Sequence, residues 1–271
     1  MPELPEVETI RRQLEPLVVG RRLGDAWAFP HPKFLPALDA AGAAVTRVGR
    51  HGKYLLLGLE DGRDLVVHLG MTGSLRVRPA GDDGDAYVRA YWDLEDDGAE
   101  PSGEALEYRD VRRFGRLAVA RPGEYAGTLG AQGPDALDPS LGPDDLWKAV
   151  KASRRAVKTQ LLSQRPLAGV GNIYADEALW RAQVHPGART LTRVQAARLL
   201  PAIVEVLTES IDNGGTTLRD YRTVEGEPGR NQRRLDAYGR AGEPCRRCGT
   251  ILRRMVLDAR TTTFCPACQA R

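Results

Sequence analysis

The chain has 271 residues, of which 42% are hydrophobic and 28% are charged, and its formal net charge is +3. This length suggests about two domains of ordinary size. No apolar run approaches the roughly 18 residues that span a bilayer. The acidic N-terminus also lacks the basic and then apolar order of a signal peptide. We therefore expect a soluble cytoplasmic protein without a membrane partner.

The small net charge hides a strong asymmetry along the chain. Residues 82–110 hold eleven acids and two arginines, whereas residues 230–271 hold ten arginines and three acids. A basic terminal segment is the electrostatic footprint of a protein that binds a polyanion. A solvated charged face is the alternative, and charge alone does not decide between them.

The opening MPELPEVE indicates a helix that begins almost at the chain start. Pro5 suits the first helical position, and Glu6 and Glu8 in the first turn are favoured by the helix dipole. Apolar residues follow at helical spacing at Val7, Ile10, Leu14 and Leu17. Gly20 is a plausible stop. Residues 2–4 are then a short extended segment ahead of the helix.

Pro2 has chemical potential of its own if Met1 is trimmed, because its nitrogen then becomes a secondary amine. An α-amino group has a pKa of about 7.7–8.0, so a useful fraction is neutral near neutral pH. A neutral amine beside the carboxyl groups of Glu3 and Glu6 is suited to covalent catalysis at a carbonyl-like carbon. The alternative is that these residues only start a helix, and the residue types alone leave both open.

From Leu23 to about Ala120 the sequence has β character and predicts a β-sandwich. Two apolar runs flank an Asp61-Gly62 turn, which is a good hairpin signal. A further pair of strand-like runs flanks the charged tip VRRFG, residues 111–115. We expect the acidic stretch before it to form turns and a solvent-facing strand.

The second half of the chain reads as helical after a Gly/Pro/Ala-rich linker at 125–143. Helical patterns cover 144–164, 172–184 and 194–214, and the GVG turn before the second of these gives a Gly-rich double turn. Two helices joined in this way resemble a DNA-binding helix–turn–helix device. Asn172 would cap the second helix, where backbone N–H groups can bind phosphate, although an ordinary cap explains it equally well. Residues 220–240 are polar and indicate a loop.

Phe114 and Met71 are candidate probes of a base stack. An exposed phenylalanine beside two arginines is costly unless it finds a partner. In a nucleic-acid reader such a side chain can insert between bases. Inward packing of both residues is the alternative.

The four cysteines form a C-x2-C pair, sixteen residues, and a second C-x2-C pair: Cys245, Cys248, Cys265 and Cys268. This spacing is typical of a tetrahedral zinc site of four thiolates. Two disulfides are the alternative, but disulfides are rare in cytosolic proteins. The segment is too short for a core of its own, so the metal would supply its folding free energy.

Seven motifs occur in one order over nearly the whole chain: MPELPEVETIRR, HGKYLLL, HLGMTGSL, RDVRRFG, GVGNIYADE, GGTTLRDY and YGRAGEPCRRCG with FCPAC. Together they resemble the bacterial formamidopyrimidine-DNA glycosylases, which excise 8-oxoguanine and ring-opened purines. The resemblance implies an α+β, two-domain fold, with an N-terminal β-sandwich and leading helix, a helix–two-turn–helix domain and a zinc-finger β-hairpin. DNA would bind in the cleft between the domains.

This resemblance divides the chain into a catalytic domain at 1–124, the linker at 125–143, a DNA-binding domain with a lesion loop at 144–235 and a zinc finger at 236–271. The finger would hold one structural zinc ion. The loop at about 220–236 matches the family segment that covers the extruded base. The expected partner is double-stranded DNA containing oxidised purines, bound by a monomer that joins the bacterial nucleoid when on DNA.

The resemblance also assigns the chemistry of the chain start. Pro2 would attack C1′ of the damaged nucleoside, expel the base and form an iminium intermediate. Glu3 would act as acid and base at the sugar ring, and Glu6 would help to hold the active site together. Lys53 would contact the lesion base or a phosphate. From this Schiff base, β- and then δ-elimination would cut the strand on both sides of the site.

Further residues match family positions that contact DNA. Met71, Arg112 and Phe114 would fill the gap left by the flipped nucleotide, with Arg112 serving the orphaned cytosine. Asn172 and Arg260 would hold the phosphates beside the lesion, and we place Arg260 in the catalytic set. Lys158 is added as an expected DNA-binding residue.

The sequence leaves two other functions open. An endonuclease VIII-like glycosylase would share the fold and nucleophile but prefer oxidised pyrimidines. A non-catalytic zinc-finger DNA-binding protein would need no Pro2, Glu3 and Lys53 set. The acidic region departs from the family pattern, and the lesion loop is unusually rich in arginine, so base preference could differ.

Overall fold

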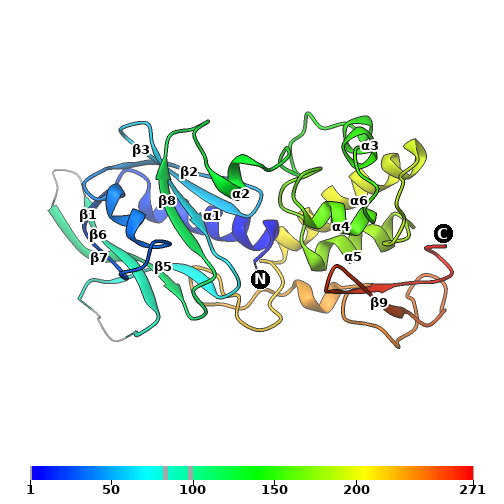
Figure 1. Cartoon of the computed structure of the whole chain (residues 1–271). Coiled ribbons are helices and arrows are strands. Elements are labelled where there is room, and N and C mark those ends of the chain that lie inside the picture. Colours follow the sequence, from blue (N-terminus) through cyan, green and yellow to red (C-terminus); the bar gives the residue numbers. More distant parts are fainter. Residues whose placement is uncertain (1, 82–84, 97–99, 271) are drawn as a thin grey trace. The chain divides into compact units, whose positions relative to one another are not determined.

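The computed structural model of the chain describes residues 2–81, 85–96 and 100–270 and divides them into two compact units (Figure 1). Unit 1 comprises the chain up to residue 130 together with residues 213–230, and unit 2 comprises residues 131–212 and 231 onward. The segment 213–230 thus belongs with the N-terminal residues. The division into four segments expected from the sequence is finer than these two units and stays a prediction.

Helix α1, Leu4–Val18, begins with a capping box between Glu3 and Glu6. Each of these residues provides hydrogen bonds that the first turn of a helix lacks, which is why the helix starts so close to the chain start. Pro5 lies in the first turn, as expected, although the helix begins one residue earlier. The helix buries its apolar stripe at Val7, Ile10, Leu14 and Val18.

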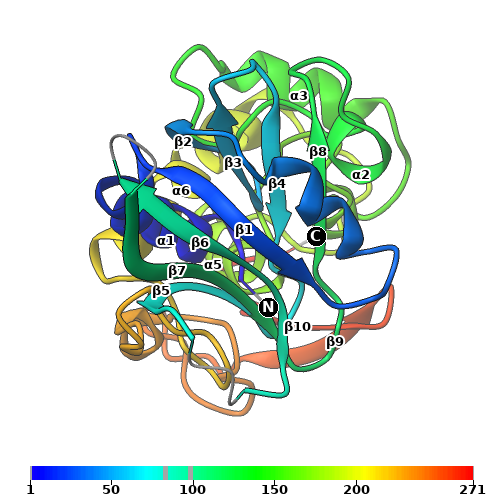
Figure 2. The same ribbon diagram turned by 90° about the vertical axis from the view of Figure 1, so that its left-hand side faces the viewer.

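Unit 1 contains two four-stranded antiparallel sheets, which Figure 2 shows as separate layers. One has the order β1-β6-β7-β5 and the other the order β2-β3-β4-β8. The first sheet consists of β1 (Arg22–Ala28), β5 (Gly73–Pro79), β6 (Val88–Asp96) and β7 (Glu100–Asp110). The second consists of β2 (Val45–His51), β3 (Tyr54–Leu59), β4 (Asp64–His68) and β8 (Arg116–Ala120).

The predicted sandwich is confirmed, because one apolar core collects side chains from both sheets and from α1. Trp92 of β6 is fully buried there, and its indole Nε1 donates to the carbonyl of Ala37 at 3.0 Å. Ala37 lies in the 3-10 helix η1, Leu35–Ala40, which covers part of the same core. The hairpin expected around Asp61-Gly62 is also present as β3 and β4.

The expectation for the acidic region was partly wrong. Strands β6 and β7 are the two inner strands of their sheet, not turns beside one solvent-facing strand. Alternate residues of β6 point into the core, so Asp93 and Glu95 occupy the other face, and Asp96 is exposed at the strand end. Glu107 is buried and accepts from Arg76 Nε at 2.6 Å and Arg78 Nε at 2.5 Å. Residues 82–84 and 97–99 of this region lie outside the described residues.

The strand-like runs beside the VRRFG tip are strands β7 and β8, but they do not pair with each other. Each belongs to a different sheet, so residues 111–115 carry the chain from one sheet to the other. Arg113 has a positive φ of 55° in this connection. Gly70, with a φ of 64°, comes so close that an added Cβ would lie 2.5 Å from Gly115 N.

Unit 2 is helical, as expected, with a hairpin at its end. Its helices are α3 (Pro143–Lys151), α4 (Val157–Leu162), α5 (Asn172–Arg181) and α6 (Arg193–Asp212). The pattern at 144–164 predicted one helical stretch, but the chain breaks at 152–156 between α3 and α4. The predicted linker contains the short helix α2 (Gly127–Gly130). The 3-10 helix η2 (Asn231–Arg234) precedes the hairpin of β9 (Arg253–Leu257) and β10 (Arg260–Phe264).

The double turn between α4 and α5 is organised by the side chain of Gln164. Its Nε2 donates to Val170 O at 2.6 Å, and its Oε1 accepts from Gly169 N at 2.9 Å. Tyr174 and Ser210 share a hydrogen bond of 2.5 Å that joins α5 to α6. These contacts give the predicted helix–two-turn–helix a fixed geometry.

Helices that combine the length and the apolar character needed to cross a membrane are absent from the described ranges.

Gly70 tests how tightly the 111–115 connection is fixed. In Gly70→Ala, the new Cβ would overlap backbone atoms at 2.5 Å, whereas in Gly42→Ala it would meet nothing within 4 Å. Both glycines have a positive φ, so the loss of unfolding free energy in Gly42→Ala measures the backbone strain alone, which is about 1 kcal/mol. We expect Gly70→Ala to lower the free energy of unfolding by about 2 kcal/mol more in urea titrations. Equal losses would mean that the connection relaxes freely.

Candidate active site

The chain start is enclosed by protein atoms. Pro2 and Glu3 are buried, and Glu6 is only 1% exposed. The Glu6 carboxylate accepts from Glu3 N at 2.8 Å through one oxygen and from Thr216 N at 2.7 Å through the other. A carboxylate that accepts two backbone N–H bonds is strongly held. Glu6 therefore fixes the first residues of the chain to the segment 213–230.

The segment 213–230 packs closely against the Glu6 carboxylate. Gly215 has a φ of 84°, and an added Cβ would lie 3.1 Å from Glu6 Oε1. Tyr221 is buried against the apolar core and donates its hydroxyl to Gly214 O at 3.2 Å. Burial raises the pKa of Tyr221, and the neighbouring Glu6 charge raises it further, so the phenol stays protonated. Residues 220–240 were expected to form a polar loop, but Tyr221 and Val224 at its start pack into the apolar core.

Lys53 lies in the two-residue turn of the β2–β3 hairpin, where His51 pairs with Tyr54. Gly52 takes a positive φ of 55°, which glycine tolerates at the first turn position. Lys53 is buried, and its charge acts on His68, whose ring lies 4.7 Å from that of Tyr54. Burial, followed by the charges of Lys53 and Arg116, lowers the pKa of His68 to about 4. The ring is therefore neutral at neutral pH.

Asp110 joins the loops that carry Met71, Arg112 and Phe114, the three residues expected to fill the gap in the DNA, which we call the wedge. This buried carboxylate accepts from Thr72 Oγ1 at 2.6 Å and from Gly115 N at 2.7 Å. Thr72 Oγ1 in turn accepts from Arg112 N at 3.0 Å. The loop of Met71 and the loop of Arg112 and Phe114 are thus held side by side by one buried acid.

The wedge side chains themselves remain accessible. Phe114 is 50% exposed, and the Arg112 guanidinium stacks over its ring at 4.6 Å. Met71 is partly exposed. Lys33 Nζ donates to Arg113 O at 2.9 Å, which supports the turn. The contact between the guanidinium and the ring is favourable, and it leaves half of the phenylalanine surface open to a partner.

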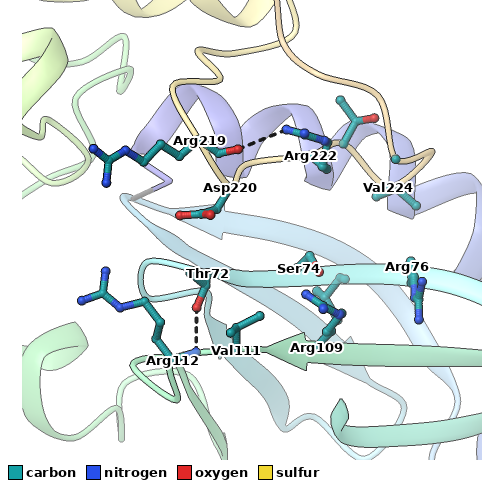
Figure 3. A pocket seen from close by; sticks show the side chains of 13 residues that line it. Thr72, Ser74, Arg76, Arg109, Val111, Arg112, Arg219, Asp220, Arg222 and Val224 are labelled. Atoms are coloured by element: carbon teal, nitrogen blue, oxygen red, sulfur yellow. Dashed lines mark hydrogen bonds between the residues drawn. The ribbon is translucent and has the colours of Figure 1, made fainter. Parts of the chain in front are cut away.

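A cavity of about 510 Å³ opens between these loops and the segment 213–230 (Figure 3). Five arginines share its lining with one acid: Arg76, Arg109, Arg112, Arg219, Arg222 and Asp220. Figure 3 shows Thr72, Ser74 and Arg112 on one side and Arg219, Asp220 and Arg222 on the other. Its volume is typical of a small-ligand pocket, and its arginines favour an anionic or electron-rich ligand.

In unit 2, Asn172 is the first residue of α5, not its cap. Gly171 holds the cap position, and no side chain makes the capping hydrogen bond. Asn172 Oδ1 is buried without a hydrogen-bond partner among the described residues. Phosphate oxygens accept hydrogen bonds, so the group that suits a phosphate at this helix N-terminus is the Nδ2 amide of Asn172, and the helix dipole favours an anion there.

Lys158 does not lie where a DNA contact requires. It is 0% exposed, and its ammonium lies 2.6 Å from Asp176 Oδ1 and donates to Thr262 Oγ1 at 2.9 Å. The expectation from the sequence placed it on the binding surface. The structure places it in the interior, because a buried carboxylate on the next helix requires a counter-ion.

Arg260 is the exposed first residue of β10. It pairs with Leu257 across the two-residue turn Asp258–Ala259, in which both residues have positive φ values of 46° and 58°. This is the backbone of a tight hairpin turn of type I′. Arg260 therefore projects directly from a hairpin tip.

The four cysteines meet at the other end of the hairpin. Their sulfur atoms all lie within 4.8 Å of one another. Four thiolates around zinc at ~2.3 Å require sulfur atoms only ~4 Å apart, so the cluster fits a tetrahedral zinc ion. Trp180 Nε1 donates to Cys245 Sγ at 3.3 Å, a contact that orients one ligand. The disulfide alternative is not needed to explain the cluster.

Three family descriptions match the chain. The Formamidopyrimidine-DNA glycosylase N-terminal domain matches residues 1–117, the Formamidopyrimidine-DNA glycosylase H2TH domain matches 132–222, and the zinc finger found in FPG and IleRS matches 242–271. The chain is 44% identical to the formamidopyrimidine-DNA glycosylase of Thermomicrobium roseum over 99% of each chain. It is also 44% identical to that of Thermus thermophilus over 99% of this chain and 98% of the relative.

The chain belongs to the formamidopyrimidine-DNA glycosylase family.

Solved structures of the formamidopyrimidine-DNA glycosylase family share this fold. The crystal structure of the MutM (Fpg) protein from Thermus thermophilus matches with a TM-score of 0.88 at 43% identity, covering 100% of this chain and 99% of that one. A MutM structure in complex with carbocyclic 8-oxo-G containing DNA matches with a TM-score of 0.88 at 31% identity and complete coverage of both chains. The chain is accordingly a DNA glycosylase of base excision repair with AP lyase activity, and its cysteine cluster holds one structural zinc.

Sequence reasoning missed several residues that organise this glycosylase. Asp110 and Gln164 fix loops through hydrogen bonds, and Glu177 accepts from three consecutive backbone N–H groups at 236–238. In the sequence, Asp110 is marked only by its position directly before the VRRFG tip. That position suggests a role for Asp110 but does not indicate which groups it binds.

His68 gives the unfolding free energy a pH dependence. Its folded pKa of about 4 lies below the ordinary ~6.5, so the unfolded chain takes up the proton first and stability is lost as the pH falls from ~6.5 to 4. Between pH 7 and pH 5 this loss should be about 2 kcal/mol. Urea unfolding of the wild type and of His68→Gln at both values measures it. The variant should not show this loss of about 2 kcal/mol between pH 7 and pH 5. An identical pH dependence of the unfolding free energy in both proteins would contradict the lowered pKa of His68.

Removal of zinc should loosen the finger but not the rest of the chain. Among the described residues, the apolar cluster of the finger is small: Trp180, Ala237, Cys245, Leu252 and Cys265. The metal therefore supplies most of the folding free energy of this segment. After chelation we expect trypsin to cleave first near Arg253 and Arg254, at a rate at least about tenfold above that of the zinc-loaded protein. Unchanged protection would show that the finger is stable without metal.

Proposed function

We propose that this glycosylase excises oxidised purines, 8-oxoguanine and formamidopyrimidines, from double-stranded DNA through the amine of Pro2. The observation that carries the proposal is the buried chain start, in which Glu6 binds Glu3 N and Thr216 N. A chain terminus normally frays, and a fixed terminus is useful when its amine must meet a substrate atom at a set place. Met1 lies outside the described residues, and its removal is part of the proposal.

The chemistry proceeds from a neutral secondary amine. Pro2 N attacks C1′ of the flipped nucleotide, the bond from C1′ to the base breaks, and the base leaves with a proton. The Glu3 carboxyl donates a proton to O4′ as the sugar ring opens, and the amine loses its own proton, which leaves an iminium. Loss of a C2′ proton expels the 3′ phosphate, and a second elimination expels the 5′ phosphate. Water then hydrolyses the remaining Schiff base and frees Pro2.

The accessible wedge supports extrusion of the damaged nucleotide. Flipping costs a few kcal/mol of stacking and pairing, which inserted side chains partly restore. Met71 and Phe114 would occupy the vacated stack, and Arg112 would bind the orphaned base. The buried Asp110 gives this wedge its rigidity, so that insertion does not deform the loops.

The arginine-lined cavity is our proposed site for the extruded base. Carbonyl-rich edges of an oxidised purine suit guanidinium donors, and Asp220 offers an acceptor for ring N–H groups. Lys53, held in its hairpin turn, would contact the lesion or its phosphate. Asn172 and Arg260 would hold neighbouring phosphates, which favours a bend in the DNA.

The remaining expectations follow from the same proposal. Zinc thiolates need a reducing compartment, which supports a cytoplasmic location with association to the nucleoid through DNA. A monomer suffices, because a single chain supplies every group named above.

Borohydride trapping tests the nucleophile and the substrate class together. We expect a covalent adduct at Pro2 on a duplex with 8-oxoguanine opposite cytosine, and at least about tenfold less on a duplex with an oxidised pyrimidine. Pro2→Gly, or a chain that retains Met1, should lose the adduct while binding the duplex with unchanged affinity. Mass spectrometry of the trapped peptide locates the bond.

Undiminished trapping in the Pro2→Gly variant would overturn the nucleophile. Trapping mainly on the oxidised pyrimidine would leave the nucleophile in place and overturn the substrate class.

A further inference from the structure

Helix α5 presents one face to the C-terminal segment that contains the finger. Asn172, Asp176 and Trp180 are four residues apart, so they lie on one side of the helix, a turn apart from each other. Asp176 Oδ2 accepts from Thr263 N of β10 at 2.9 Å. Trp180 donates to the zinc-ligand sulfur of Cys245. The helix that begins with Asn172 therefore also holds the finger.

Lys158 of α4 completes the contact with β10. Its ammonium lies 2.6 Å from Asp176 Oδ1 and donates to Thr261 O at 3.2 Å and Thr262 Oγ1 at 2.9 Å. Through this pair, α4 and α5 hold three consecutive residues, 261–263, which directly follow Arg260. These contacts bind backbone and short side-chain atoms, so they fix the position of the strand itself.

The turn before Arg260 is held as well. Asp258 forms an ion pair with Arg155 at 3.0 Å, and Arg155 lies just before α4. Both turn residues have a positive φ, which for Asp258 and Ala259 is a strained backbone that must be supported by its surroundings. Arg260 thus follows a turn that an exposed ion pair connects to the residues just before α4, and it precedes residues 261–263, which the buried Lys158–Asp176 pair holds.

Glu177 fixes the other end of the finger. Its buried carboxylate accepts from the backbone N–H groups of Asp236, Ala237 and Tyr238 at 2.8, 2.9 and 2.7 Å. Two adjacent carboxylates of α5 thus hold the chain ahead of the first zinc ligand and ahead of the third. The zinc ion fixes the interior of the finger, whereas these acids fix its position on the helices.

The buried pair is an expensive way to hold a strand. Asp176 is 1% exposed, and burial raises its pKa to about 6 although Lys158 and Thr263 N oppose the shift. An apolar pair of similar volume often stabilises a protein equally well or better. A buried ion pair that also hydrogen-bonds a backbone specifies position, which apolar packing specifies less sharply.

We propose that Asp176, with Lys158 as its counter-ion, is a positioning residue that fixes Arg260 of the finger relative to Asn172, so that both side chains meet neighbouring DNA phosphates at once. The proposal rests on the phosphate roles given to Asn172 and Arg260 in the proposed function. Asp176 and Lys158 touch no DNA themselves. Because they hold β10 in place before DNA binds, binding does not have to supply the free energy of ordering the backbone at Arg260.

The test uses the full zinc-loaded chain and a duplex with a tetrahydrofuran abasic analogue, on which no iminium can form. The variant Lys158→Met with Asp176→Leu removes both charges and the acceptor of Thr263 N. We expect its affinity to fall about tenfold with one zinc per chain retained, and the slope of log Kobs against log salt to lose about 0.9. Arg260→Ala should show a similar loss, and the combined variant should lose nothing further.

Asp144→Asn is the matched control, because it removes a carboxylate of unit 2 that is exposed and paired with Arg193. It should bind like the wild type. If the Met/Leu variant loses zinc, Asp176→Glu takes its place. This substitution keeps the charge pair but displaces β10 by about one methylene, and its loss should likewise vanish in the Arg260→Ala background.

Unaltered affinity in the pair variant, beside a clear loss in Arg260→Ala, would overturn the positioning role and leave the proposed phosphate contact intact. A loss that adds fully to that of Arg260→Ala would also overturn it, because the pair would then act through general stability. Wild-type binding by Arg260→Ala would overturn the phosphate role of Arg260 itself, and the positioning proposal with it.

Discussion

The carboxylate of Glu6 is the constraint on which the chain start depends. It accepts one hydrogen bond from its own helix terminus, at Glu3, and another from Thr216, which lies 210 residues further along the chain. This second contact holds the start of α1 against the segment 213–230. Because the carboxylate is buried and each of its oxygens accepts a backbone N–H bond, the backbone at Glu3 is fixed in place. The same contact holds the segment that lines the arginine-rich cavity.

A second buried acid has the same role for the exposed wedge. Asp110 stands at the end of β7, where the chain leaves one sheet for the other, and it binds both loops that carry the wedge residues. The connection has a strained residue at Arg113 and a close backbone approach at Gly70. Such strain persists only where the surroundings determine the conformation. The result is an aromatic side chain that stays exposed instead of folding back onto the sheet.

In unit 2 the corresponding acids are Asp176 and Glu177 on α5. Charge alone would place acidic residues far from a DNA-binding surface, since phosphates repel them. Here the two carboxylates are buried and do not face solvent. Lys158 pairs with Asp176, and backbone N–H groups donate to both acids. In both units, then, buried acids fix the backbone, and in unit 1 five arginines line the cavity. A net charge of only +3 is therefore compatible with a cavity rich in arginine, because some of the acids are buried elsewhere.

The sequence by itself determined the features that depend on local spacing. The start of α1, the hairpin at Asp61-Gly62 and the C-x2-C pairs follow from residues a few positions apart, whose geometry the backbone dictates. The motifs were also sufficient to predict the family and the two layers of the sandwich. The tertiary structure alone decided what depends on distant partners. The inner position of β6 and β7, the crossing of residues 111–115 between sheets and the burial of Lys158 all depend on contacts between residues far apart in the chain. The sequence around a lysine does not show whether its ammonium faces water or a buried aspartate. The packing of α4 against α5 places Lys158 beside Asp176 and so decides it.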